Sequence, residues 1–305
     1  MIETNLSVII CTHNPRTDYL QRVLGALKTQ TLPKERWELL LIDNASEKIL
    51  ASEIDLKWHP NSRHIREEQL GLTVARLRGI KESAAETLVF VDDDNVLDRD
   101  YLEIVLQISK DYPFIGAWGG QIRPDFEIEP PSWTRPYWPI LAVREFDRDK
   151  WSNLLHQHET TPCGAGLCIR KPVGEYYAKL LASRVGQVQL DRKGEELTSC
   201  GDSDLAFTAC DMGLGTGQFQ ALKMTHLIPA VRVQVDYLEK LAEGIRYSDA
   251  ILNSLRGRSP KKDSWRRKLY LKYYRWTLSS EQKRIFDAAE RGLHRALQEL
   301  DPRSS

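Results

Sequence analysis

The sequence predicts an α/β fold in which a mostly parallel central sheet is flanked by helices and followed by a C-terminal helical extension. Two observations carry this prediction. Short apolar runs alternate with amphipathic stretches over residues 6–95, and residues 237–305 are helical in pattern and highly charged, with a break at 257–260. Unbroken apolar runs are typical of strands buried on both faces, and the amphipathic stretches supply the crossovers that parallel strands require.

The first part of the chain reads as strand, helix, strand, helix, strand. The expected strands are 8–10, 39–42 and 88–91, and the expected helices are 19–27 and 72–84. Each apolar run ends in polar residues. Because ligands bind outside the carboxyl ends of strands in an open α/β sheet, we expect these three strand ends to form the floor of one pocket.

The regular alternation stops between residues 111 and 160, where prolines and tryptophans accumulate, so we expect a loop-rich aromatic segment there. A short strand at 166–169 follows. Residues 202–212 then predict a helix that begins with acidic residues and is closed by Gly213, since carboxylates favour a first turn and glycine favours a helix end.

The length and charge of the chain limit its possible domain organisation and partners. Its 305 residues suit one substantial domain with an appendage, or two domains. Its 43 basic and 43 acidic residues balance, so no global field favours nucleic acid as a partner. We expect a catalytic domain over 1–235, with a nucleotide-binding half at 1–110 and an acceptor and catalytic half at 111–235. Residues 236–305 would form the helical extension.

The number and spacing of the cysteines indicate a reducing compartment. There are five, an odd number, and no two have Cys-x-x-Cys spacing, which argues against a disulfide framework and a zinc ribbon. The chain opens without a basic leader region, and its apolar runs are too short to span a bilayer. We therefore expect a cytoplasmic location, with room for peripheral contact at the inner face of the membrane.

Three consecutive carboxylates are the most informative feature of the chain. The apolar run 88–91 delivers Asp92, Asp93 and Asp94 to the end of an expected buried strand. Adjacent like charges repel and are costly to desolvate, so a cation or another strong positive partner is needed to neutralise them. The sequence thus predicts a metal site, and the alternative is a solvated acidic turn.

Several short motifs occur in a recognisable order. They are Cys11-Thr12-His13-Asn14-Pro15, Asp43-Asn44, Gly71-Leu72-x-x-Ala75-Arg76, the Asp triplet, Gly164-Ala165-Gly166, Gly201-Asp202-Ser203-Asp204-Leu205 and a late His226. As an ordered set over about residues 6–232, they resemble the family 2 glycosyltransferases of GT-A fold. The resemblance implies a GT-A fold and a metal-dependent, inverting transfer of a sugar from a nucleoside-diphosphate sugar, with a UDP-sugar favoured. It also implies a glycan or lipid-linked acceptor hydroxyl and a part in polysaccharide biosynthesis.

The same resemblance assigns a metal site. Asp94 would be the direct ligand of Mn²⁺ or Mg²⁺, with Asp92 and His226 completing the protein ligands, and Asp92 or Asp93 would also touch the ribose or base. A divalent cation stabilises the charge that develops on a departing diphosphate. The alternative for His226 is a hydrogen-bonded core histidine between strands.

A catalytic base is implied by the motif near residue 202. An inverting transfer needs a carboxylate to take the proton from the acceptor hydroxyl, and Asp202 aligns with the family's base. The family usually has Glu where this chain has Gly201, which leaves Asp202 and Asp204 as the two candidates. Either could instead be a helix N-cap.

Further residues are expected around the donor. Those implied to bind the nucleotide or its sugar are Thr12, Asn14, Asp43, Arg76, Asp92, Asp93, Gly164 and Gly166. Asp43 would bond the base or ribose, and the two glycines would let backbone approach the donor sugar. Arg76 offers fixed donors to anionic oxygens, although an exposed helical arginine is more often a solvated charge.

Two aromatic segments carry less specific signals. Residues 131–138 lie where this family places acceptor-facing loops, and their tryptophans could stack on a sugar or simply hold the loop. Residues 261–276 contain seven basic residues and one acid, with aromatic residues at helical spacing. This pattern fits peripheral contact with an anionic membrane or, alternatively, an accessory helix that packs on the protein.

Two other functions compete with sugar transfer. Asp92-x-Asp94 and Gly201-Asp202 also resemble motifs of haloacid-dehalogenase-like, Mg-dependent phosphatases, but two βα units precede the triplet here. A non-catalytic nucleotide-sugar-binding protein is the other alternative, since Gly201 departs from the family pattern. A dinucleotide-binding oxidoreductase is disfavoured because no Gly-x-Gly-x-x-Gly follows the first strand.

Overall fold

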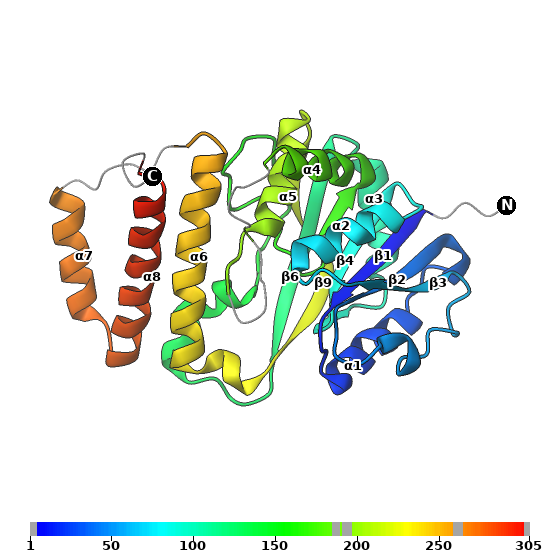
Figure 1. The fold of residues 1–305 in the computed structure, drawn as a ribbon, viewed down its shortest axis with the longest axis horizontal. Coiled ribbons are helices and arrows are strands. Elements are labelled where there is room, and N and C mark those ends of the chain that lie inside the picture. The colour runs from blue at the N-terminus through cyan, green and yellow to red at the C-terminus, as the bar shows by residue number, and fades with distance from the viewer. Residues whose placement is uncertain (1–4, 185–189, 191–196, 259–264, 302–305) are drawn as a thin grey trace. The chain divides into compact units, whose positions relative to one another are not determined.

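The computed structural model describes residues 5–184, 190, 197–258 and 265–301 (Figure 1). The strands are β1 (Leu6–Thr12), β2 (Trp37–Asn44), β3 (Ser62–Glu67), β4 (Thr87–Asp92), β5 (Asn95–Leu97), β6 (Ile115–Phe126), β7 (Lys150–Ser152), β8 (Cys168–Arg170) and β9 (Gly215–Ile228). The α-helices are α1 (Thr17–Lys28), α2 (Leu72–Glu82), α3 (Tyr101–Asp111), α4 (Lys171–Ser183), α5 (Gly201–Asp211), α6 (Val235–Leu255), α7 (Trp265–Thr277) and α8 (Ser280–Glu299). Short 3₁₀ helices are η1 (Lys34–Arg36), η2 (Leu50–Ser52), η3 (Ser132–Leu141) and η4 (Ala230–Val233).

The strands form one mixed sheet in the order β3-β2-β1-β4-β8-β6-β9-β5, with β7 paired to β9. Strands β1 to β4 are parallel to their neighbours within this group, whereas β8 runs antiparallel to β4 and to β6. Strand β9 is antiparallel to both β5 and β7. The predicted α/β class is therefore confirmed, and the parallel part is the predicted strand–helix–strand half of the chain.

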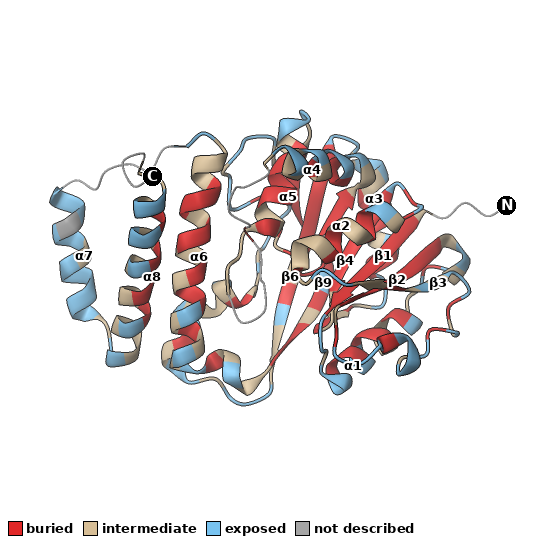
Figure 2. Ribbon diagram, in the orientation of Figure 1, coloured by how far each residue is buried: buried red, intermediate tan, exposed pale blue. Residues whose placement is uncertain are grey.

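Strands β1, β2 and β4 are buried along almost their whole length (Figure 2). Alternate residues of one strand enter two different hydrophobic clusters: Val8 and Ile10 belong to the first, and Ile9 belongs to the second. The first cluster contains apolar residues of α1 and α3, and the second contains those of α2, α4 and α5. Helices thus cover both faces of the sheet, which explains why these strands read as unbroken apolar runs.

Five strands were not expected from the sequence: β3, β5, β6, β7 and β9. Strands β6 and β7 lie within 111–160, so the prediction of a loop-rich segment is wrong for residues 115–126 and 150–152. Strand β3 has the sequence Ser-Arg-His-Ile-Arg-Glu, in which Ile65 is the only buried residue, and it pairs in parallel with β2 at the edge of the sheet. An edge strand is covered on fewer sides and can be largely polar, so the apolar-run signal that identified its neighbours is missing here.

The chain forms two compact units. Unit 1 contains 1–125, 142–187 and 202–228, and unit 2 contains 126–141, 188–201 and 229–305. Unit 1 holds most of the sheet and the helices packed on it. The charged C-terminal region lies in unit 2, where Leu255 ends α6 and the predicted break follows; of that break, Gly257 and Arg258 are described and residues 259 and 260 lie outside the described part.

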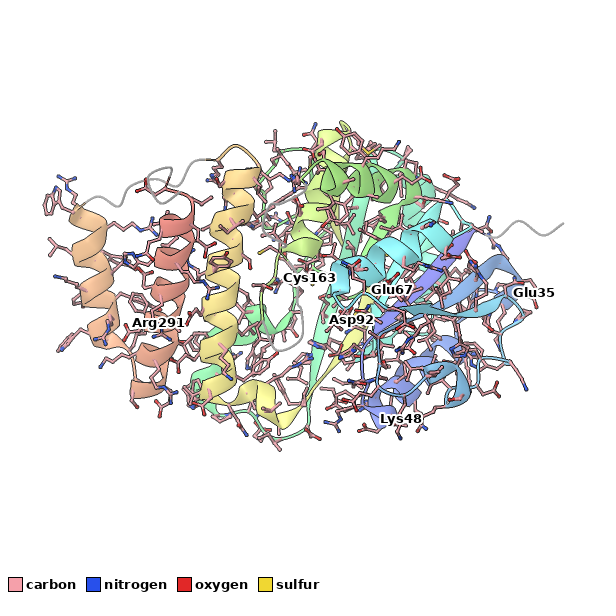
Figure 3. All side chains as sticks on the ribbon, in the orientation of Figure 1. Glu35, Lys48, Glu67, Asp92, Cys163 and Arg291 are labelled. Atoms are coloured by element: carbon pink, nitrogen blue, oxygen red, sulfur yellow. The ribbon has the colours of Figure 1, made fainter. Side chains whose placement is uncertain are left out.

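Unit 2 is organised by the packing of α8 on α6. Gly292 of α8 lies so close to α6 that a Cβ added there would come within 2.1 Å of the carbonyl oxygen of Glu243. Ion pairs line the same contact, with Arg291 (labelled in Figure 3) 3.0 Å from Glu239 and 3.1 Å from Glu243. The two helices are therefore joined by close backbone contact and by charge.

Candidate active site

The carboxyl ends of β1, β2 and β4 meet at one edge of the sheet in unit 1. The register pairs Thr12 of β1 with Asp43 of β2, and Cys11 of β1 with Asp92 of β4. The Thr12 hydroxyl donates a hydrogen bond to the carboxylate of Asp93. The structure therefore brings the three predicted strand ends together, as the floor of one site.

Asp94 and His226 form a buried pair beside this floor. Asn95 in β5 is the register partner of His226 in β9, and the backbone N–H of Leu227 donates to the carbonyl of Asp94 over 2.9 Å. Asp94 Oδ2 lies 3.3 Å from His226 Nε2, while Asp94 Oδ1 accepts a 2.8 Å bond from the Asn95 amide. Both predicted ligands are therefore held in place by the β5–β9 pairing.

The Asp94–His226 pair can be tested against the expected metal. Within the described residues, no three His, Cys, Asp or Glu side chains gather in a way that could hold a cation. Asp92 lies 4.0 Å from Arg76. A carboxylate and an imidazole side by side still fit a divalent ion that takes its remaining ligands from substrate phosphates and water, as Mg²⁺ commonly does.

Asp202 is held at the start of α5 by backbone donors. Its Oδ2 accepts a 2.6 Å hydrogen bond from the N–H of Gly164, and its Oδ1 accepts a 2.8 Å bond from the N–H of Ser203. A Cβ on Gly164 would lie 2.5 Å from Nη2 of Arg76 and 3.4 Å from Oδ2 of Asp202. Glycine at 164 is therefore what allows Arg76 and Asp202 to lie this close together.

Arg76 is buried, so the expectation of a solvated helical arginine is wrong. The residue is 4% exposed, and its guanidinium carbon lies 6.0 Å from the centre of the Phe90 ring. With Asp92 at 4.0 Å and Gly164 against its Nη2, the cation is fixed between the triplet and the Asp202 motif. A buried guanidinium in such a position suits an anionic ligand.

Cys163 shares this environment. Burial raises the pKa of its thiol, and among the smaller influences the charge of Arg144 lowers that pKa while Asp202 and Asp92 raise it. Asp92 and Cys163 are both labelled in Figure 3. Asp92 and Asp202, which are 110 positions apart in the sequence, therefore act on the same thiol.

Asp204 has different contacts from Asp202. Its side chain is buried, and Arg184 Nη1 lies 2.7 Å from its Oδ2. Its backbone carbonyl also accepts a bond from the Thr208 hydroxyl one turn later. The ion pair accounts for the burial of Asp204, whereas Asp202 is half-buried and faces Gly164.

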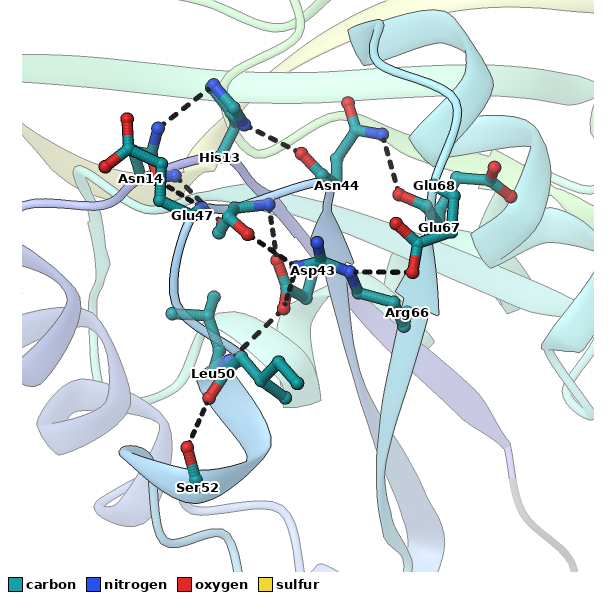
Figure 4. A network of polar contacts seen from close by, with 12 residues as sticks. His13, Asn14, Asp43, Asn44, Glu47, Leu50, Ser52, Arg66, Glu67 and Glu68 are labelled. Carbon is teal, nitrogen blue, oxygen red and sulfur yellow. Dashed lines mark hydrogen bonds and ion pairs between the residues drawn. The ribbon is translucent and has the colours of Figure 1, made fainter.

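Asp43 organises the loop after β2 (Figure 4). Its oxygens accept bonds from the N–H of Ser46 (3.1 Å), the N–H of Leu50 (3.2 Å) and the Arg66 guanidinium (2.8 Å). Burial acts to raise the pKa of Asp43, but the bonds from Ser46, Arg66 and the backbone outweigh it and lower the pKa overall. The carboxylate is thus kept ionised, and the direct contact to a base or ribose stays a prediction.

Asn14 ties the end of β1 to the same loop. It has a left-handed backbone with φ of 47°, its N–H donates to the Ser46 hydroxyl, and its Oδ1 accepts from the N–H of Glu47. The neighbouring ring of His13 contacts the carbonyl of Asn44 through Nδ1 at 2.8 Å. Hydrogen bonds therefore tie the motif after β1 to the end of β2 and the loop that follows it, as Figure 4 shows.

Gly166 is packed against Tyr101. It has φ of +68°, and its carbonyl accepts a 2.7 Å bond from the hydroxyl of Tyr101, whose pKa is raised by burial. A Cβ at this position would lie 2.6 Å from that hydroxyl. Gly166 thus supports the turn that carries Gly164, and its expected closeness to the sugar stays a prediction.

Two residues that position the site were not among the residues predicted to form it. Asn44 accepts a bond from the N–H of Gly71 and donates to the carbonyl of Gln69, each over 2.8 Å, so it positions the start of the helix that carries Arg76. Asn95 bonds Asp94 and the N–H of Asp92. Both follow predicted strand ends, and their amides, able to donate and accept at once, were the available signal.

The aromatic segment 131–138 lies in η3 and belongs to unit 2. The carbonyl of Trp133 accepts a 3.4 Å bond from the Gln282 amide, and the ring of Trp138 lies 5.0 Å from that of Phe126. These contacts fit the expectation that the tryptophans hold the loop. An acceptor-facing role for the segment stays a prediction.

The family assignment rests on a sequence match. Residues 7–169 match the model of the family described as glycosyl transferase family 2. The chain belongs to this family. The match covers the parallel half of the sheet, the triplet and the Gly164 turn, and this membership excludes the phosphatase interpretation of the Asp-x-Asp sequence.

Known proteins support the assignment over parts of their length. Glycosyltransferase AglE of Haloferax volcanii is 34% identical over 101 residues, which are 32% of this chain and 33% of AglE. The chain therefore matches about a third of that relative.

Comparison with solved structures identifies the fold. TarS of S. aureus has a TM-score of 0.55 at 15% identity, with 98% of this chain and 50% of that chain covered. TarS 1-349 in complex with UDP-GlcNAc has a TM-score of 0.52 at 14% identity, covering 98% of this chain and 82% of that one. With the family match, this confirms the predicted GT-A fold of this family 2 member.

Proposed function

We propose that this family 2 chain is a metal-dependent, inverting glycosyltransferase that uses a UDP-sugar and a hydroxyl acceptor on a glycan or lipid-linked substrate. The observation that carries the proposal is the grouping of Asp202, Gly164 and Arg76 beside the Asp triplet. It combines a fixed carboxylate with a buried cation next to the strand ends. The UDP-GlcNAc complex of TarS, which has a similar fold, supports the choice of donor.

Asp202 is the proposed base. Its carboxylate takes the proton of the acceptor hydroxyl while the acceptor oxygen bonds to the anomeric carbon of the sugar. The bond from that carbon to the diphosphate breaks on the opposite side, and its electron pair leaves with the diphosphate. The N–H groups of Gly164 and Ser203 orient the carboxylate, and the ion pair of Asp204 with Arg184 favours Asp202 over Asp204 for this role.

Arg76 is proposed to stabilise the departing diphosphate. Its guanidinium presents fixed N–H donors from a buried position, where a charge–charge interaction is screened less than in water. Asp94 and His226 would hold a Mn²⁺ or Mg²⁺ ion. Such an ion, when bound, would add Lewis-acid stabilisation of the phosphate oxygens.

The nucleoside is proposed to lie over the ends of β1 and β2. Thr12 and Asp93 offer a hydroxyl and a carboxylate to the ribose, and Asp43, kept ionised by Arg66, offers an acceptor to the base or ribose. Asn14 would close this side of the pocket. The odd cysteine count supports a reducing, cytoplasmic location, where the protein would serve polysaccharide biosynthesis.

The test is release of UDP from a panel of UDP-sugars in the presence of Mn²⁺. We expect Asp202→Asn to lower turnover at least about 100-fold, because general-base catalysis contributes this much or more, while UDP affinity is retained. Asp211→Asn, an exposed position on the same helix, is the matched control and should leave turnover unchanged. Undiminished UDP release by Asp202→Asn would refute its assignment as the base.

The metal is tested in the same assay. Chelation with EDTA should abolish turnover and weaken UDP binding, and Asp94→Asn should reproduce the loss at any Mn²⁺ concentration that saturates the wild type. Asp98→Asn, which removes a carboxylate paired with Arg123 outside the site, is the control. UDP affinity that is insensitive to both EDTA and Asp94→Asn would contradict metal dependence.

A further inference from the structure

Helix α7 has one face that is anchored and one that is not. Arg275 is bonded to Asp287 of α8 through two nitrogens, over 2.7 and 2.8 Å, and the ring of Tyr274 lies 5.9 Å from that of Phe286. Leu271, on the same side, is half-buried. These contacts fix which face of α7 is turned toward α8.

The opposite face carries an aromatic stripe. Its residues, Trp265, Leu269, Tyr273 and Trp276, are 67%, 56%, 65% and 74% exposed. Their spacing of four, four and three positions puts them on one side of a helix. Apolar side chains this large that stay more than half exposed form a surface that does not pack against the described residues, so the expectation that the stripe holds α7 to the protein is wrong.

Cations flank the stripe. At 100° per residue, Arg266 falls on one side of it and Lys272 on the other, and both residues are exposed. The Arg266 guanidinium lies 5.5 Å from the ring centre of Trp265. The one acid of residues 261–276 is Asp263, which lies with 261, 262 and 264 outside the described residues. The surface of α7 is therefore aromatic in the middle and positive along its edges.

We propose that this stripe docks the protein on the surface of an anionic lipid bilayer. Trp and Tyr side chains prefer the headgroup region, where the ring is partly desolvated and its polar edge remains hydrated. The flanking cations meet negative headgroups at the same depth. Across the described residues, none of the helices has the length and apolar character needed to cross a bilayer, so α7 would lie in the interface.

The charge argues against a second copy of the chain as the occupant. A symmetric contact through this face would bring two sets of positive edges together with no described acid on the α7 surface to offset them. A negatively charged partner meets no such cost. Of the two kinds of negatively charged partner, the exposed aromatic rings favour a lipid bilayer, whose headgroup region can accommodate them, and disfavour an acidic protein.

The test is co-sedimentation of the full chain with vesicles of phosphatidylcholine alone or mixed with phosphatidylserine, without nucleotide. Omitting the donor makes the result independent of the proposed transfer. We expect binding to the mixed vesicles only, with weakening at high salt. Trp265→Ser/Trp276→Ser should reduce the partition coefficient at least about tenfold, and Arg266→Gln/Lys272→Gln about 25-fold at low salt.

Matched control variants distinguish docking through α7 from non-specific adsorption to vesicles. Trp151→Ser, at a tryptophan that is 55% exposed in unit 1, and Lys57→Gln/Lys110→Gln, at exposed lysines, should leave the partition coefficient unchanged. Unchanged circular dichroism would show that the α7 variants are folded. Equal binding to neutral vesicles, or full binding by either α7 variant, would overturn the proposal. So would self-association or binding of an acidic polypeptide that is lost in these variants without any lipid binding.

Discussion

At the scale of single residues, three aspartates differ in what surrounds their carboxylates. Asp204 is buried against Arg184, Asp202 is oriented by two backbone N–H groups, and Asp94 lies beside His226. A buried carboxylate with an arginine partner is a structural charge, since removing either member leaves the other unpaired. A half-buried carboxylate that is oriented by backbone N–H groups is better suited to accept a proton.

Gly164→Ala tests the closeness of Arg76 to the Asp202 motif. The new Cβ would start 2.5 Å from Nη2 of Arg76, so the guanidinium must shift. We expect UDP affinity to fall about tenfold, the effect of about 1.4 kcal/mol, because the cation leaves its position next to the triplet. Isothermal titration with UDP measures this.

The control for this prediction is Gly25→Ala in α1. No atom lies within 4 Å of a Cβ there, and alanine is the better helix former, so UDP affinity should not change. Equal UDP affinities for Gly164→Ala and the wild type would argue against a role of Arg76 in binding the diphosphate.

At the scale of elements, the chain between β2 and β3 is held by aromatic packing. The ring of His59 lies 4.0 Å from that of Trp37 at the start of β2, and Asn61 donates its N–H to His59 Nδ1 over 3.2 Å. Burial, and to a lesser extent the charge of Lys34, lower the pKa of His59 to about 4. The folded protein therefore keeps this histidine neutral.

This pKa shift predicts a pH dependence of stability. The unfolded chain binds a proton at His59 once the pH falls below about 6.5, while the folded chain resists it until about pH 4. The free energy of unfolding should therefore drop by up to about 3 kcal/mol between these values and level off below them. Urea unfolding at several pH values measures the drop.

His59→Gln is the decisive variant, because its side chain does not titrate. Its unfolding free energy should decline less over this pH range than that of the wild type, with His158→Gln, at an exposed histidine, as the matched control. Parallel pH profiles for the wild type and His59→Gln would rule out this histidine as the source.

At the scale of the whole molecule, binding residues and the C-terminal helices belong to different compact units. Every residue assigned to the donor site lies in unit 1, whereas α6, α7 and α8 lie in unit 2. Stability and affinity can therefore be altered at separate places in the chain. The α6–α8 contact is the natural place to alter stability alone.

Gly292→Ala is expected to destabilise the protein without affecting the site. Its Cβ would lie 2.1 Å from the Glu243 carbonyl, a backbone atom that can move only if the helices separate, so a loss of about 1–3 kcal/mol is expected. Calorimetry should show a lower unfolding temperature for the variant. Titration with UDP, carried out roughly 15–20 °C below that temperature so that the variant is folded, should show an unchanged affinity.

Gly292→Ala should lower the unfolding temperature and leave UDP affinity unchanged. Gly164→Ala should do the opposite: it should lower UDP affinity and have little effect on the unfolding temperature. A Gly292→Ala protein that is fully folded by circular dichroism but has lost UDP affinity would contradict the confinement of the site to unit 1.

Much of the site could be predicted from local pattern. The strand ends at Thr12, Asp43 and Asp92 follow apolar runs long enough to be buried strands, and parallel strands bring such ends to one edge. The burial of Arg76 and the ion pair of Asp204 could not be predicted in this way, because their partners are distant in sequence. The edge strand β3 was missed because it is mostly polar.

By itself, the sequence determined the α/β class, the family and the order in which polar residues meet the sheet edge, since periodicity and motif order are local properties of the chain. Only the tertiary structure decided that Asp204 is paired with Arg184, that Gly164 makes room for Arg76, and that the α7 stripe faces away from α8. Those outcomes depend on which side chains from distant segments come within a few ångströms of each other, and a linear pattern does not contain that distance.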